Sequence, residues 1–331
     1  MRLAVIGGGA WGTTLAHVAA RRVGDVSLWA REPDVVQSIN RAHVNARFLA
    51  GVPLHEGVRA TDQVLDAVRD REAIVFAAPS HVLRDVVRAA ATCVPASATV
   101  VVATKGIERG TLALMSDVAA QELPGRKVVA LSGPSFALEV ARNQPTALVA
   151  ASRDADAAAA MQQVFSAATL RVYTNDDVAG VELGGALKNV MAIATGIADG
   201  LELGLNSRAA LITRGLAEMT RLGVALGARA ETFAGLAGLG DLVLTCTGAL
   251  SRNRTLGVEI GRGRTLAEVL AERETVAEGV VTTESTCDLA TREGIEMPIV
   301  QAVARVLFSG LDPRAAITSL MSRDLRSERD E

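Results

Sequence analysis

The N-terminal segment, MRLAVIGGGAWG, constrains the fold of this chain more than any other. Residues 2–6 form a short apolar, partly β-branched run that ends in glycines, and helical spacing of apolar residues follows. This order predicts a strand, a tight turn and a helix. The turn matches the GxGxxG pattern through Gly7, Gly9 and Gly12. In this context we expect a dinucleotide pyrophosphate at the helix start, rather than a turn that is merely rich in glycine.

Further apolar runs alternate with helix-like segments through the first half of the chain. We expect strands at 26–30, 73–77, 99–103, 128–131, 147–151 and 170–173. Strands buried on both faces and separated by helices predict a doubly wound, mainly parallel sheet, in which the last strands could pair antiparallel. The fold class is therefore α/β, with a Rossmann-like NAD(P)-binding domain over residues 1–177.

After residue 177, long Leu/Ala-rich segments with helical periodicity replace the strands. We expect helices at roughly 178–203, 206–227, 253–261, 265–272, 278–293, 297–309 and 313–321. They predict a second, all-helical domain over 178–321. Residues 322–331 are almost all charged, and we expect this tail to be frayed.

Composition excludes several classes of protein. The 331 residues suggest two domains. A net charge of −3 provides no basic field for nucleic acid or an anionic membrane, and 3% aromatic residues leave few platforms for stacking bases. No apolar stretch reaches the roughly 18 residues of a membrane span, and the N-terminus lacks the features of a signal peptide. We therefore expect a cytoplasmic protein.

Metal and disulfide chemistry are not indicated either. The three cysteines are an odd number and lie far apart without CxxC spacing, and the four histidines show no ligand spacing. We expect no bound metal, and cysteines that are small buried residues in a reducing compartment.

The choice between the two nicotinamide coenzymes is expected at the end of the second strand. An acidic residue there binds a ribose hydroxyl, whereas a basic one accommodates a 2′-phosphate. The chain has Arg31 followed by Glu32. Because Arg31 is nearer the strand end, we expect NADPH to be favoured and NADH tolerated; the alternative is that both are solvated loop charges.

Ligands of open α/β sheets collect beyond the carboxyl ends of the strands. The loops 78–80, 104–106 and 132–135 follow predicted strands. Lys105 could lean over this crevice as a point charge for an anionic substrate, or it could be a solvated loop lysine. Ser135 could contact a ligand or simply cap the following helix.

Lys188 lies off the apolar stripe of its predicted helix. Its neighbours three, four and seven residues away are all small: Gly184, Gly185, Ala192 and Thr195. A face without bulky side chains indicates that something approaches Lys188 closely. The alternative is a salt-bridged surface lysine on a helix whose glycines permit tight packing.

The segment 235–257 is the most unusual in the chain. Asp241 follows an apolar, glycine-rich lead, where a lone carboxylate is costly unless it is paired, and a lysine is its natural partner. Ser251, Arg252 and Asn253 then precede a helical pattern, so a serine cap, free backbone donors and arginine forks indicate an anion site. A helix cap at Asp241 and an ordinary surface arginine at 252 are the alternatives.

These motifs together resemble the NAD(P)-dependent glycerol-3-phosphate dehydrogenases of the bacterial type. The resemblance runs nearly end to end, in family order, through GGGAWGTTLA, ATKGIE, LSGPSFALEVA, VELGGALKNV, ALITRGLAEM, GLGDLVLTCT, SRNR, EGVVTTES and GIEMPI. Two departures stand out: Ala10 replaces a serine that many members carry, and Glu32 occupies a position that is basic in some members.

The resemblance implies that the helical domain, 178–321, is the substrate and catalytic domain, with Lys188 as the catalytic acid/base. Around the substrate it implies Lys105, Gly133, Ser135, Lys188, Asp241, Ser251, Arg252 and Asn253. Along the cofactor, beside the three motif glycines, it implies Trp11, Arg31, Lys105, Ala137, Arg252, Val276 and Glu278. A homodimer is expected because family members are commonly dimers.

The expected reaction is reversible hydride transfer between NAD(P)H and dihydroxyacetone phosphate, giving sn-glycerol 3-phosphate for phospholipid synthesis. Lys188 would protonate the developing alkoxide, Asp241 would orient Lys188, and the nearby charge of Lys105 would favour its neutral form. Arg252 would anchor the substrate phosphate. Two alternatives stay open: another reductase of this architecture acting on a 2-keto or β-hydroxy acid, and a non-catalytic nicotinamide sensor.

Overall fold

The computed structural model describes residues 1–272, 277–325 and 327, which form two compact units. The first comprises Met1–Lys105 and Ala113–Glu182, and the second comprises Gly106–Leu112 and Leu183–Glu331. The short stretch Gly106–Leu112 thus interrupts the first unit in sequence and belongs to the second.

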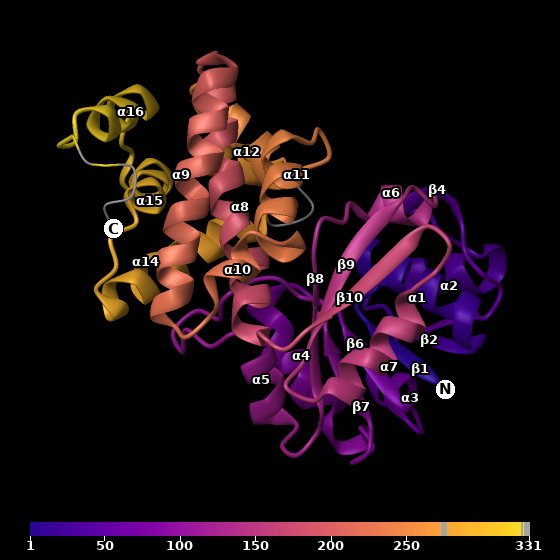
Figure 1. Ribbon diagram of the computed structural model, residues 1–331. Coiled ribbons are helices and arrows are strands. Elements are labelled where there is room, and N and C mark those ends of the chain that lie inside the picture. Colours follow the sequence, from indigo (N-terminus) through magenta and orange to yellow (C-terminus); the bar gives the residue numbers. More distant parts are fainter. Residues whose placement is uncertain (273–276, 326, 328–331) are drawn as a thin grey trace. The chain divides into compact units, whose positions relative to one another are not determined.

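The first unit is built on an eight-stranded sheet of order β10-β9-β8-β7-β6-β1-β2-β5 (Figure 1). Its strands are β1 (Leu3–Ile6), β2 (Val26–Trp29), β5 (Val58–Thr61), β6 (Ala73–Phe76), β7 (Thr99–Val102), β8 (Val128–Ser132), β9 (Thr146–Ala151) and β10 (Leu170–Asn175). All pairs are parallel except β8 with β9. The seven expected strands and the mainly parallel sheet are confirmed, and β5 is an additional edge strand.

Helices cover both faces of this sheet because its strands alternate between two cores. In β1, Leu3 and Val5 belong to one apolar cluster, whereas Ala4 and Ile6 belong to the other. The first cluster includes residues of α1 (Ala10–Val23), α2 (Pro33–Ala42), α6 (Ala137–Ala141) and α7 (Ala155–Phe165). The second includes residues of α3 (Val64–Val68), α4 (Leu83–Ala90) and α5 (Met115–Glu122). A small antiparallel hairpin, β3 (Val44–Asn45) and β4 (Leu49–Pro53), completes the unit.

The second unit is helical throughout its described residues. Its helices are α8 (Val178–Gly200), α9 (Gly204–Ala225), α10 (Ala230–Phe233), α11 (Asp241–Thr247), α12 (Arg252–Gly261), α13 (Leu266–Ala271), α14 (Glu278–Glu293), α15 (Pro298–Ser309) and α16 (Pro313–Met321). A π-helical turn, Leu236–Gly240, leads into α11. The seven expected helices are confirmed, whereas α10, the π-helical turn and α11 were not expected.

Helix α8 spans the boundary between the two units in sequence. Its residues Val178–Glu182 belong to the first unit, and it is buried over most of its length.

Of the described helices, none alone has the length and apolar composition of a membrane span. One pair that is bent by 48°, Ala230–Thr247 with Arg252–Gly261, has them when the two are taken together. The tail residues 322–325 and 327 are exposed, and the other tail residues lie outside the description.

Candidate active site

The glycine-rich turn between β1 and α1 has the geometry that a dinucleotide phosphate requires. Gly7 has a φ of +132°, which a residue with a side chain rarely adopts. A Cβ atom on Gly12 would lie 1.9 Å from the Gly7 carbonyl oxygen, whereas one on Gly9 would meet nothing within 4 Å. The glycines therefore close the turn tightly and leave open space at the helix start. Beside it, the buried Nε1 atom of Trp11 has no protein partner among the described residues, as a ligand-binding donor would.

The two residues expected to choose the coenzyme bind each other. The Arg31 side chain is 83% exposed, and its Nε and Nη2 atoms donate to one Glu32 oxygen at 3.1 and 2.9 Å. A carboxylate therefore shares the guanidinium that would meet a 2′-phosphate.

The loops after β7 and β8 meet at one carbonyl. Lys105 Nζ and Ser135 Oγ each donate to the Gly133 carbonyl oxygen at 3.0 Å. Gly133 has a φ of +127°, so the turn depends on glycine. The alternative that Ser135 caps the next helix is wrong: Phe136 is the N-cap residue of α6, and Ser135 turns back to its own loop. Ala137 opens α6, and its carbonyl accepts a hydrogen bond from Thr14 of α1 at 3.1 Å.

In the second unit, Lys188 and Asp241 form a buried ion pair. Lys188 Nζ lies 2.9 Å from Asp241 Oδ1, and the two side chains are 9% and 2% exposed. Lys188 Nζ also donates to Thr245 Oγ1 at 2.7 Å, and Thr245 Oγ1 donates to the Asp241 carbonyl oxygen at 2.7 Å. The expected pairing of Asp241 with a lysine is confirmed. The alternative of a surface lysine is wrong, because the Lys188 side chain is buried. Among the described residues, one of its three N–H bonds remains without a partner.

Close packing between Gly184 and Gly238 brings Asp241 to Lys188. Gly184 lies one turn before Lys188 on α8, and a Cβ atom there would be 2.5 Å from the Ala237 carbonyl oxygen and 3.2 Å from Gly238 Cα. The π-helical turn therefore packs directly on the backbone of α8 and delivers Asp241 at the start of α11. Part of the small face around Lys188 is thus occupied by the protein's own backbone.

Burial also decides the state of the thiol beside this pair. Cys246 follows Thr245 on α11 and is fully buried. Burial raises the pKa of Cys246 to about 12, so its thiol stays neutral at physiological pH.

A second buried network joins α8, α12 and α14. Asn253 Nδ2 donates to Asn189 Oδ1 at 2.9 Å, and Asn253 Oδ1 accepts from the Gly279 backbone N–H at 3.0 Å. Asn189 is 3% exposed, and its Nδ2 atom has no protein partner among the described residues. A buried donor in this state is an orphan that a bound polar ligand would satisfy.

The remaining expected residues lie at helix starts. Ser251 caps α12, since its Oγ accepts from the Arg254 backbone N–H at 3.2 Å. Arg252 is exposed at the first position of α12, and Glu278 is the first residue of α14. Val276 lies outside the described residues.

Sequence reasoning missed Thr245 and Asn189. Thr245 lies one turn after Asp241 on α11, so an expected helix there would have placed its hydroxyl on the same face as the carboxylate. Asn189 immediately follows Lys188 in a run of apolar residues, and an amide in that setting is itself the signal of a buried polar contact.

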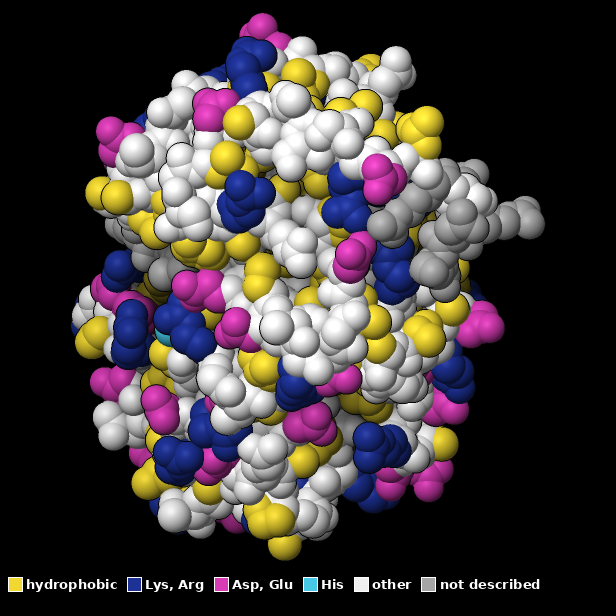
Figure 2. Space-filling view, turned by 90° about the vertical axis from the view of Figure 1, so that its left-hand side faces the viewer, with side chains coloured by type: hydrophobic (Ala, Val, Ile, Leu, Met, Phe, Trp, Pro, Cys, Tyr) yellow, Lys and Arg dark blue, Asp and Glu magenta, His cyan; other side chains and the backbone are white. Residues whose placement is uncertain are grey.

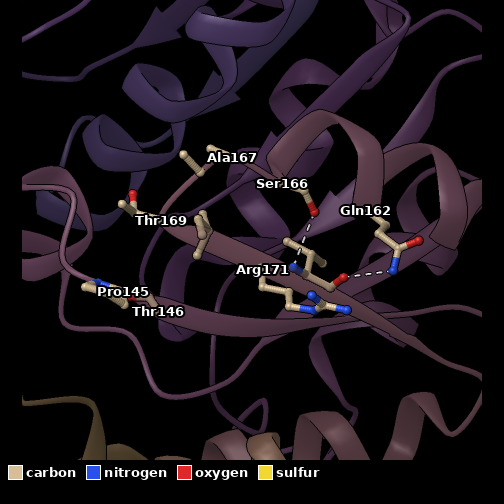
Figure 3. A pocket seen from close by; sticks show the side chains of 10 residues that line it. Pro145, Thr146, Gln162, Ser166, Ala167, Thr169 and Arg171 are labelled. Carbon is tan, nitrogen blue, oxygen red and sulfur yellow. Dashed lines mark hydrogen bonds between the residues drawn. The ribbon is translucent and has the colours of Figure 1, made fainter.

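One surface depression lies apart from all these residues within the first unit (Figure 3). It is lined by residues 145–146, 162 and 166–172, beside edge strand β10. Its polar groups largely satisfy one another: Ser166 Oγ accepts from the Val172 N–H at 3.3 Å, and Gln162 Nε2 donates to the Val172 carbonyl oxygen at 2.8 Å. The depression contains none of the expected site residues.

The face shown in Figure 2 has no large region of a single charge sign. Basic and acidic side chains are interspersed there, in keeping with a net charge of −3. An anionic ligand must therefore be recognised locally. Among the described residues, no cluster of three or more His, Cys, Asp or Glu side chains could hold a metal ion.

Comparison with known proteins gives consistent matches. The family model described as NAD-dependent glycerol-3-phosphate dehydrogenase N-terminus matches residues 2–158, and the C-terminus model matches residues 177–318. Proteins named glycerol-3-phosphate dehydrogenase [NAD(P)+] from Geobacter sulfurreducens and Geobacter metallireducens are each 53% identical, with 99% of both chains covered. A crystal structure of glycerol-3-phosphate dehydrogenase from Coxiella burnetii is 41% identical, has a TM-score of 0.94, and covers 97% of this chain and 99% of its own.

Proposed function

This chain belongs to the NAD-dependent glycerol-3-phosphate dehydrogenase family, and on that premise we propose how its residues perform the family's reaction. The reaction is reversible hydride transfer between NAD(P)H and dihydroxyacetone phosphate, giving sn-glycerol 3-phosphate. The bound coenzyme supplies the hydride. The glycine turn fits a dinucleotide because it combines open space at Gly9 with the unsatisfied Nε1 of Trp11.

Lys188 is the acid/base of this proposal. Two of its N–H bonds are taken by Asp241 and Thr245, and the third is available for the substrate oxygen. As the ketone is reduced, Lys188 Nζ gives a proton to the alkoxide oxygen; in the reverse direction it removes the hydroxyl proton. Asp241 and Thr245 hold the ammonium in position, since both partners are buried and their contacts are short. The proposal rests mainly on these two buried contacts of Lys188 Nζ, with Asp241 and with Thr245.

The substrate phosphate is assigned to the start of α12. Arg252 offers a guanidinium fork, and Ser251 and Asn253 flank it at a helix start with backbone donors. Lys105, Gly133 and Ser135 are assigned to the substrate as well. Lys105, Arg31, Ala137, Arg252, Glu278 and Val276 are assigned to the coenzyme. Binding energy from the phosphate would position the ketone, so a truncated ketone should react poorly.

A direct assay tests the activity. Purified protein mixed with NADPH and dihydroxyacetone phosphate should consume the reduced coenzyme, and Lys188→Met should abolish most of the rate. Ketopantoate and unphosphorylated dihydroxyacetone serve as comparison substrates. Faster turnover of ketopantoate would favour the acid-reductase alternative, and coenzyme binding without any turnover would favour a sensor.

We further propose a cytoplasmic homodimer, with NADPH the preferred coenzyme and the product feeding phospholipid synthesis. The resemblance to the bacterial members of the family supports both the dimer and the location. Sedimentation velocity at several protein concentrations tests the dimer, and a monomeric mass at micromolar concentration would contradict it.

A further inference from the structure

Two helices that carry site residues, α8 and α12, touch through glycines. Gly196 and Gly200 of α8 lie against Gly257 and Gly261 of α12. A Cβ atom on Gly196 would lie 2.1 Å from the Arg254 carbonyl oxygen, and one on Gly257 would lie 2.2 Å from the Ile193 carbonyl oxygen. Non-bonded heavy atoms need about 3.5 Å. No side chain therefore fits at this crossing, and the two backbones are in direct contact.

Polar contacts fasten the same two helices beside the glycines. Arg254 Nη2 lies 2.7 Å from Asp199 Oδ2, and Arg208 of α9 takes the other oxygen of Asp199 at 2.6 Å. Nearer the site, Asn253 is bonded to Asn189 of α8. The unsatisfied Nδ2 of Asn189 lies at this end of the contact and independently indicates a ligand there.

We propose that this glycine contact sets the distance between the Lys188 ammonium and the start of α12, and thereby selects substrates by the spacing of carbonyl and phosphate. The inference rests on the proposed function of the site. Lys188 lies about two turns before Gly196 on α8, and Arg252 lies in the turn before Gly257 on α12. Because helices behave as stiff rods over so few turns, their crossing point fixes the separation of these two side chains. Asp241 and Thr245 are held against α8 independently, through Gly184.

Gly196→Ala tests this inference because the added methyl group must displace α12 by about 1 Å. The measurements are kcat/KM for dihydroxyacetone phosphate, for its homologue with one more methylene between carbonyl and phosphate, and for unphosphorylated dihydroxyacetone. A misplacement of this size costs up to about 10²-fold in kcat/KM for the natural-length substrate. We expect a smaller loss with the longer homologue, so that the preference for the shorter one falls at least about tenfold. The rate with dihydroxyacetone should change little.

Two further variants control for general damage. In Gly215→Ala, the new Cβ atom would meet the flexible Met191 side chain of α8 at 2.8 Å and leave α12 alone, so length preference should stay at the wild-type value. Arg254→Gln loosens α12 without steric conflict and should shift length preference in the same direction, even if Gly196→Ala does not fold. If the preference for the shorter phosphorylated substrate is unchanged in Arg254→Gln and in folded Gly196→Ala, the inference is overturned, whereas the proposed function still stands. Failure of the wild-type protein on dihydroxyacetone phosphate would instead overturn the proposed function, and the inference with it.

Discussion

At the scale of single residues, we expect the buried pair of Lys188 and Asp241 to contribute both to catalysis and to stability. Removing one partner of such a pair leaves an uncompensated buried charge, which costs more than the pair itself contributes. Lys188→Met should therefore lower kcat by roughly 10² to 10⁴, the usual contribution of a positioned proton donor, and should also destabilise the fold.

The double variant Lys188→Met with Asp241→Asn separates these two effects. It removes the lone buried carboxylate, so the urea midpoint should recover while kcat stays low. Coenzyme binding, measured by fluorescence titration, should be little changed in both variants. Near-normal turnover in a folded Lys188→Met protein would remove Lys188 from the mechanism.

Arg252 tests the phosphate anchor. Each charge-assisted hydrogen bond to a phosphate contributes about 1.5 to 3 kcal/mol, so Arg252→Ala should cut kcat/KM for dihydroxyacetone phosphate by at least about tenfold per bond lost. At saturating coenzyme, the weak rate with unphosphorylated dihydroxyacetone should hardly change, and added phosphite should raise that rate in the wild type but not in the variant. Equal losses on both substrates at saturating coenzyme would contradict a role of Arg252 at the phosphate.

We expect coenzyme preference to depend on the pairing of Arg31 with Glu32. Glu32 accepts two hydrogen bonds from Arg31, so Glu32→Gln should weaken this pairing by removing the carboxylate charge, and should lower KM for NADPH relative to NADH. Arg31→Ala should do the reverse, because only NADPH carries a 2′-phosphate. Steady-state kinetics with both coenzymes measures the two ratios. If Arg31→Ala harms both coenzymes equally, Arg31 serves the adenine or the loop instead.

At the scale of elements, a buried carboxylate holds the start of α15. Glu218 of α9 accepts hydrogen bonds from the Ile299 and Val300 N–H groups at 2.8 and 3.3 Å. Burial raises the pKa of Glu218 from 4.5 to about 7. Between those values the folded protein keeps a proton that the unfolded chain has lost, so this group makes stability fall as pH rises from about 4.5 to about 7, with no further change above.

Glu218→Gln removes this titration and keeps an acceptor for α15. Urea unfolding between about pH 5 and pH 8 should show a shallower decline than the wild type, by about 1 to 3 kcal/mol across the range. Glu231→Gln, at an exposed glutamate of the same unit, is the matched control and should follow the wild type. Parallel wild-type and Glu218→Gln curves would show that Glu218 ionises normally.

The elements that could be predicted are helices with a long apolar periodicity and strands that are buried on both faces. The strands around Leu3–Ile6 and Thr99–Val102 are continuous apolar runs, and the long helices repeat their apolar residues over many turns. In contrast, β5 reads VRAT, and in its four positions two buried residues alternate with the exposed Arg59 and the half-buried Thr61. The turn before Asp241 is held by tertiary contacts through Gly184 and Gly238, which local periodicity does not encode.

The site residues also divide into those that the local sequence reveals and those that depend on tertiary contacts. Residues whose chemistry is costly in their local sequence, such as Asp241 in an apolar run, can be recognised from the sequence alone. For Thr245 the sequence offers less: a helix at this position would place its hydroxyl near Asp241, but a threonine is ordinary in a helix, and its contact with Lys188 depends on the fold. The carbonyl shared by Lys105 and Ser135 likewise requires two loops that only the sheet order brings together.

At the scale of the whole molecule, the first unit extends beyond the boundary expected at residue 177. Glu182 is buried and accepts hydrogen bonds from the Ser116 N–H, at 2.8 Å, and from its hydroxyl, at the start of α5. A fragment of residues 1–177 leaves that N–H without its acceptor. We expect residues 1–182 to be more stable than residues 1–177 by about 1 to 3 kcal/mol in urea unfolding. The fragment 1–182 with Glu182→Ala should fall back to the shorter one; equal midpoints for all three would exclude this contribution.

The strand order has a consequence for synthesis. From β1 outward the sheet adds β6, β7, β8, β9 and β10 strictly in chain order, so each strand that leaves the ribosome finds its neighbour already made. The stretch Gly106–Leu112 is the exception. It is translated between β7 and β8, yet its Arg109 pairs with Glu284, which emerges 175 residues later. During translation this stretch therefore remains without its Arg109–Glu284 contact while the later strands are made. That contact of the second unit can form only after α14 has been synthesised.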